Sequence, residues 1–147
     1  MFALALRRDP KAAADLANGH RYNAACVAVL AGCGKGKDDP APDDDVRAGL
    51  RRQAMEWLRA DLDAWGKIPE SDGERGIAML STLRHWKEDS DLAGLRDERE
   101  LVKLAEEERD RCHKLWAEAD ALVRRAAVGM GQNGLPARQF PGNPFAN

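Results

Sequence analysis

Apolar residues recur at three- and four-residue spacing along much of this chain, which is the period of an amphipathic helix. The clearest stretch follows Asp43–Asp45, whose carboxylates predict a helix N-cap and an acidic first turn. Its predicted buried stripe comprises Val46, Leu50, Ala54, Trp57, Leu58, Leu62 and Trp65. Its predicted solvated face comprises Arg47, Arg51, Arg52, Arg59, Asp61 and Asp63.

The same period predicts helices on both sides of this one. A helix from about Glu74 to Lys87 places four large residues on one stripe, and the longest helix runs from about Glu98 to Ala127. The stripe of the first comprises Ile77, Leu80, Leu83 and Trp86. Nearer the N-terminus, Phe2–Arg8 is predicted to be the end of a helix stopped by an Asp-Pro pair, and Tyr22–Ala31 a helix of small residues.

These elements predict an all-α fold of antiparallel helical hairpins, because β-branched and aromatic residues are sparse. Residues 1–19 are interpreted as the end of a preceding helical repeat that has lost its first helix. Residues 20–67 form a hairpin with a loop insertion at 33–45, and residues 72–127 form a closing hairpin. Residues 128–147 are rich in Gly, Pro and Asn without any period, which predicts a disordered tail.

Composition and charge limit the classes of partner and the cellular compartment that we expect. The 147 residues carry 23 basic and 25 acidic side chains, so a formal charge of −2 offers no field that would gather nucleic acid. No apolar stretch approaches the length of about 18 residues that predicts a membrane span. Three cysteines at irregular spacing argue against a disulfide framework and favour a reducing compartment. We therefore expect a cytoplasmic protein that binds neither nucleic acid nor membrane.

Candidate chemical groups do not form a recognisable site in the sequence. The cysteines and histidines show neither the C-x-x-C nor the H-x-x-x-H spacing of structural zinc, so no metal or other cofactor is predicted. A glycine- and lysine-rich run at 32–37 lacks the first Gly and the final Ser or Thr of a phosphate-binding loop, which have Ala31 and Asp38 in their places. Trp57 and Trp65 are predicted to be core anchors. We expect no catalytic residues.

Four segments carry a resemblance to a known family. The segment YNAACVAVLAG at 22–32 resembles the first helix of a tetratricopeptide repeat, and AMEWLRADL at 54–62 resembles the second. The segment DLAGLRD at 91–97 is similar to one that closes such arrays, and ALALRRDP at 3–10 resembles the end of a preceding repeat. Their order resembles the C-terminal region of the bacterial serine/threonine protein kinases with tetratricopeptide repeats found in planctomycetes.

The resemblance implies a non-catalytic protein-interaction module of the tetratricopeptide type. The kinase catalytic motifs, including the glycine-rich loop, H-R-D and D-F-G, are absent from the sequence. In the family pattern, the groove that binds a protein or peptide partner would expose Tyr22, Asn23, Cys26 and Val29. Packing between helices is the alternative role for these side chains. The alternative function is a detached regulatory tail, or a gene fragment, of such a kinase.

One expectation concerns Phe2, Leu4 and Leu6. An incomplete end repeat leaves its apolar face in water, so we expect self-association, or binding to an upstream repeat segment supplied in trans, through these three side chains. Changing all three to Ser should weaken the association, because each buried large side chain contributes on the order of 1.5–3 kcal/mol. Sedimentation over a wide concentration range is the measurement. A strictly monomeric chain that binds no upstream segment would contradict the expectation.

Overall fold

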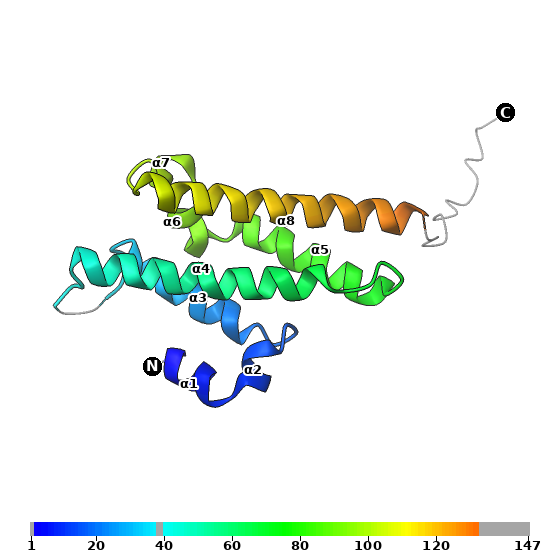
Figure 1. Ribbon diagram of the computed structural model, residues 1–147, viewed down its shortest axis with the longest axis horizontal. Coiled ribbons are helices and arrows are strands. Elements are labelled where there is room, and N and C mark those ends of the chain that lie inside the picture. Colours follow the sequence, from blue (N-terminus) through cyan, green and yellow to red (C-terminus); the bar gives the residue numbers. More distant parts are fainter. Residues whose placement is uncertain (1, 38–39, 133–147) are drawn as a thin grey trace, which may run out of the picture.

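The computed structural model describes residues 2–37 and 40–132, with side chains over 5–37 and 40–129. Every regular element in this part of the chain is helical, and none is a strand. The predicted all-α fold is therefore confirmed. Figure 1 shows the helices stacked in antiparallel pairs. No helix among the described residues is long and apolar enough to cross a membrane.

Two short helices come first. Helix α1 spans Phe2–Arg8 and α2 spans Pro10–Ala14. The Asp9 carboxylate accepts a hydrogen bond from the Ala12 amide at 3.0 Å, and Pro10 occupies the first helical position, where its missing N–H costs nothing. The predicted stop at this Asp-Pro pair is confirmed. The side chains of Phe2 and Leu4 lie outside the described residues, so the expected self-association stays a prediction.

Helices α3, His20–Gly32, and α4, Asp44–Gly66, form the first antiparallel hairpin (Figure 1). Alanines at 24, 25 and 28 are buried and let the two backbones approach closely. The Asp43 carboxylate caps α4 by accepting from the Val46 amide at 2.9 Å, as predicted. Val46 itself is 50% exposed. Val46 belongs to the predicted stripe, but the first turn of α4 extends beyond the helices that would cover this side chain.

The second hairpin pairs α5, Gly73–Glu88, with α8, Glu106–Gln132 (Figure 1). Three short helices connect them: η1, Ser90–Leu92; α6, Ala93–Arg96; and α7, Glu98–Leu101. The single helix predicted from Glu98 is therefore wrong at its start. Leu101 is fully buried and ends α7, so its place in the apolar period reflects burial in a turn of the chain and not a continuous helix.

The C-terminal end also differs from the prediction. Helix α8 continues to Gln132, beyond the predicted limit at Ala127, although Gly129 and Gly131 disfavour helix. The tail was predicted to begin at residue 128, so its first five residues are helical. Residues 133–147 of that predicted tail lie outside the described residues.

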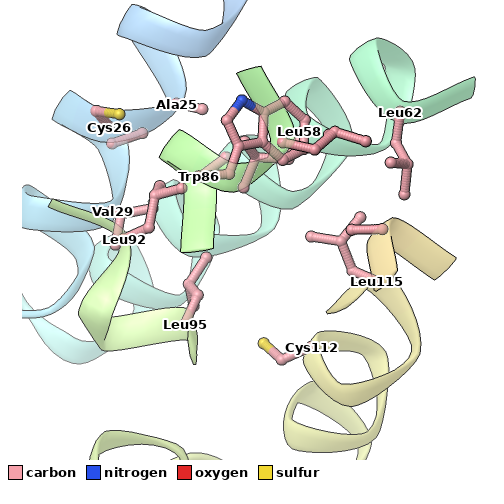
Figure 2. Packing of buried hydrophobic residues seen from close by; sticks show 14 of the residues in the cluster. Ala25, Cys26, Val29, Leu58, Leu62, Trp86, Leu92, Leu95, Cys112 and Leu115 are labelled. Atoms are coloured by element: carbon pink, nitrogen blue, oxygen red, sulfur yellow. The ribbon is translucent and has the colours of Figure 1, made fainter. Parts of the chain in front are cut away.

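The core lies between the two hairpins (Figure 2). Its largest fully buried side chain is Trp86 of α5, and leucines from α4, η1, α6 and α8 surround the same space. Trp65 is buried as predicted, whereas Trp57 is half-buried and packs at the margin. Ile77, assigned to the stripe of α5, is 49% exposed, whereas Leu80, one turn later on the same stripe, is buried.

Arg51 is not on a solvated face. Its guanidinium donates to the Gly32 carbonyl oxygen at 2.6 Å and to both carboxylate oxygens of Glu108, and its side chain is 15% exposed. A Cβ on Gly32 would lie 2.7 Å from Arg51 Cγ, so only glycine admits the arginine at this distance. Arg51 thus joins the C-terminus of α3, the middle of α4 and the first turn of α8.

Asp61 was also predicted on the solvated face and is buried instead, at 3% exposure. Its carboxylate accepts from Arg21 Nε at 2.6 Å, which joins α4 to the first turn of α3. Burial raises the pKa of Asp61, and the hydrogen bond from Arg21 opposes that rise. The periodicity placed both Arg51 and Asp61 correctly on the helix but could not show that their partners cover them.

The contacts of Arg51 predict a large difference between neighbouring arginines. Arg51→Ala leaves Glu108 and the Gly32 carbonyl without their donor, so we expect a loss of about 2–4 kcal/mol of unfolding free energy. The matched change Arg52→Ala removes an exposed side chain and should cost less than about 0.5 kcal/mol. Urea unfolding followed by circular dichroism measures both. Equal losses would contradict the assigned role of Arg51.

Candidate functional site

The four residues predicted to bind a partner lie on α3 but face different surroundings. Asn23 is exposed, Tyr22 is half-buried, and Cys26 and Val29 are buried in the core cluster. Figure 2 shows Cys26 and Val29 among the core side chains near Leu92. Asn23 therefore offers a side chain to solvent, whereas Cys26 and Val29 are occupied by packing within the chain.

Tyr22 joins α3 to α5. Its ring stacks on Trp86 with centroids 5.5 Å apart and planes inclined by 10°, and the ring of His85 meets it edge-on at 5.9 Å. The Tyr22 hydroxyl donates to Asp89, and burial raises the pKa of Tyr22, so the hydroxyl keeps its proton. This arrangement assigns Tyr22 to the contact between the hairpins.

Asp89 is the acceptor at the centre of this contact. One carboxylate oxygen accepts from the Asp91 amide at 2.9 Å, and the other accepts from Tyr22 and lies 3.3 Å from His85 Nε2. Partial burial acts to raise the pKa of Asp89, but the hydrogen bonds and the charges of His85 and Arg96 lower it overall. Asp89 therefore stays ionised and ends α5 while capping η1.

Cys26, Asp89 and Asp91 offer possible metal ligands that lie within 4.8 Å of one another. Burial raises the pKa of the Cys26 thiol to about 12, which disfavours the thiolate that binds metal. Both oxygens of Asp89 are engaged by donors of the fold. These engagements favour a structural role for the cluster over metal binding.

The segment that resembles the close of a repeat array has a clear structural task. Arg96 donates to the carbonyl oxygens of Trp86, at 3.0 Å, and Asp89, at 2.7 Å, which ties α6 to the end of α5. Gly94 is buried against Cys33, and a Cβ there would overlap the Cys33 sulfur. The glycine allows α6 to pack on the C-terminus of α3.

A groove lies between α4 and α8. The two helices run in the same direction side by side (Figure 1). A hollow of about 390 Å³ lies between them. The hollow is lined by Ala48, Arg52, Met55, Glu56, Arg59, Glu108, Arg111, Lys114 and Leu115. The residues from α4 are mostly three or four apart, so they share one stripe of the helix.

The charges around this hollow do not balance. Glu108 is paired with Arg51, and Arg59 is paired with Glu118 of α8 and with Asp63 at 3.4 Å. Arg52, Arg111 and Lys114 are exposed and make no ion pair within the described residues. Of the two lining carboxylates, only Glu56 has no basic partner there. The hollow therefore presents a surplus of positive charge.

A second hollow of about 570 Å³ continues the groove toward the C-terminal ends of both helices. It is lined by Leu62, Asp63, Gly66, Lys67, Glu118, Ala121, Leu122 and Arg125. Two basic and two acidic side chains line it, so it has no surplus of either sign. The Arg59–Glu118 ion pair lies between the two hollows and separates them.

Sequence reasoning missed this groove. The stripe of α4 that contains Arg52 and Met55 is visible in the sequence, but it was assigned partly to solvent. The other wall comes from α8, more than 50 residues later in the chain. Only the packing of the second hairpin on the first brings the two stripes together.

The chain matches no family model, no curated protein and no solved structure.

The lowered pKa of Asp89 predicts a pH-dependent contribution to stability. That contribution is present above the ordinary Asp pKa of about 3.9 and is lost as the pH falls through the lower folded value. We expect Asp89→Asn to cost about 1–2 kcal/mol at pH 7, with the deficit shrinking below about pH 4. Thermal unfolding across pH measures it. Asp110→Asn, at an exposed position of α8, is the control and should show no such trend.

Proposed function

We propose that this chain is a non-catalytic helical protein-binding module, in which the groove between α4 and α8 holds a segment of a partner protein. The observation that carries the proposal is the hollow between these helices, where the partly exposed apolar side chains of Ala48 and Met55 lie beside three exposed cations. Interaction sites combine such an apolar centre with a charged rim. The resemblance to tetratricopeptide repeats, which bind proteins through stacked hairpins, supports the same class.

The proposed surface differs from the one that the family pattern implies. That pattern would use the first helix of the hairpin, α3, whereas the groove here belongs to the second helices, α4 and α8. Asn23 remains available on the exposed face of α3 as a separate contact. Tyr22, Cys26 and Val29 join the hairpins and shape the groove only indirectly.

We further propose a cytoplasmic location and an association with bacterial protein-kinase signalling, the latter on the resemblance alone. The three cysteines are free thiols, two of them buried, which suits a reducing compartment.

The test is an unbiased selection of peptides from a display library against the folded chain. We expect selected peptides to lose binding at least tenfold to Ala48→Trp, which fills the hollow with an indole. Ala78→Trp, at an exposed position on α5, is the matched control and should leave binding unchanged. Circular dichroism checks that both variants fold. Failure to select any peptide, or equal binding to both variants, would contradict the proposal.

A further inference from the structure

We infer that the first hollow of the α4–α8 groove, between Ala48 and Arg59, selects an acidic amphipathic helix. This inference rests on the proposed function and adds the chemistry of the ligand. The ligand places bulky apolar side chains on Ala48 and Met55, and carboxylates on both flanks reach Arg52, Arg111 and Lys114.

Positive charge is concentrated in the hollow. The chain as a whole is slightly acidic, with a formal charge of −2, yet the hollow concentrates basic side chains. Glu108 and Arg59 are paired with Arg51 and Glu118, so among the described residues the three unpaired cations outweigh the single unpaired carboxylate of Glu56. A cleft with low-dielectric walls focuses such a field, which attracts a segment of opposite sign.

The cations stand on both walls of the hollow. Arg52 stands on the α4 wall, while Arg111 and Lys114 stand on the α8 wall. The apolar side chain of Met55 lines the hollow from the α4 wall. Methionine adapts its shape to varied apolar partners. A ligand that satisfies both walls needs an apolar stripe with acidic residues on each side. An amphipathic helix has this pattern.

The groove also limits the length of the ligand. Ala48 to Arg59 covers about 17 Å of α4, at about 1.5 Å per residue. The Arg59–Glu118 pair closes the hollow at that end, and the balanced charges beyond it give an acidic ligand no further attraction. A bound helix therefore makes its contacts over about three turns.

A synthetic probe tests this chemistry. It is a fluorescein-labelled helical peptide of about 14 residues, long enough for the hollow, with Leu at three- and four-residue spacing and Glu on both flanks. A matched peptide carries Lys in place of each Glu. Fluorescence anisotropy with the intact chain should show binding of the acidic peptide, weakened by added salt, and at least tenfold weaker binding of the basic one.

Charge-reversal variants locate the contact. The combined change Arg52→Glu, Arg111→Glu and Lys114→Glu should weaken the acidic peptide at least tenfold, since it replaces three attractions by repulsions. The control is Lys11→Glu, Arg84→Glu and Arg124→Glu, which alters the net charge equally at exposed positions outside the hollow. It should change binding less than about threefold, a residual long-range effect. Circular dichroism confirms that both variants fold.

The outcomes separate the two proposals. Equal binding of the acidic and basic peptides, or equal losses in the two charge-reversed variants, would overturn the acidic ligand. If Ala48→Trp still abolishes peptide binding in that case, the groove remains the binding site and the proposed function stands. Tight binding of a DNA duplex at the three cations would overturn the inference. A dimer of the chain that Ala48→Trp dissociates would also overturn it.

Discussion

The arrangement of the two hairpins depends on the contacts that the Arg51 guanidinium makes. It satisfies a carbonyl oxygen at the C-terminus of α3 and holds Glu108 in the first turn of α8, so a single side chain joins three helices. Glycine at position 32 is required because any Cβ would displace the arginine. Ionic and hydrogen-bonded contacts of this kind keep α4 and α8 side by side, with the groove between them.

A second set of contacts fixes the opposite side of the molecule. Tyr22 stacks on Trp86 and donates to Asp89, and Arg96 ties the end of α5 to α6. This side is closed by aromatic and leucine packing, whereas the α4–α8 side has ion pairs of long charged side chains in addition to its apolar contacts. The difference explains why the open groove lies on the second helices. It also explains why Cys26 and Val29, on the closed side, are occupied by the core.

The sequence predicted the helices well and the surroundings of their side chains less well. The helix stop at Asp9-Pro10 and the cap at Asp43 were predicted correctly because both depend on groups within a few residues. Burial was wrong at Val46 and Ile77, since a period assigns a face to a helix without showing how far its neighbours extend. The acidic run at Glu106–Glu108 begins α8, whereas the apolar period predicts a helix that already starts at Glu98.

By itself, the sequence determined that the described chain is helical, approximately where α3, α4 and α5 lie, and that side chains such as Leu58, Trp65 and Trp86 belong to the core. These properties follow from local propensity and periodicity, which act over a few residues. Only the tertiary structure decided that Arg51 and Asp61 are buried, that Tyr22 joins the hairpins, and that α4 and α8 form a groove. Each of these depends on residues distant in sequence. The local sequence around a charged side chain does not show whether that side chain is hydrated or paired with a buried carboxylate.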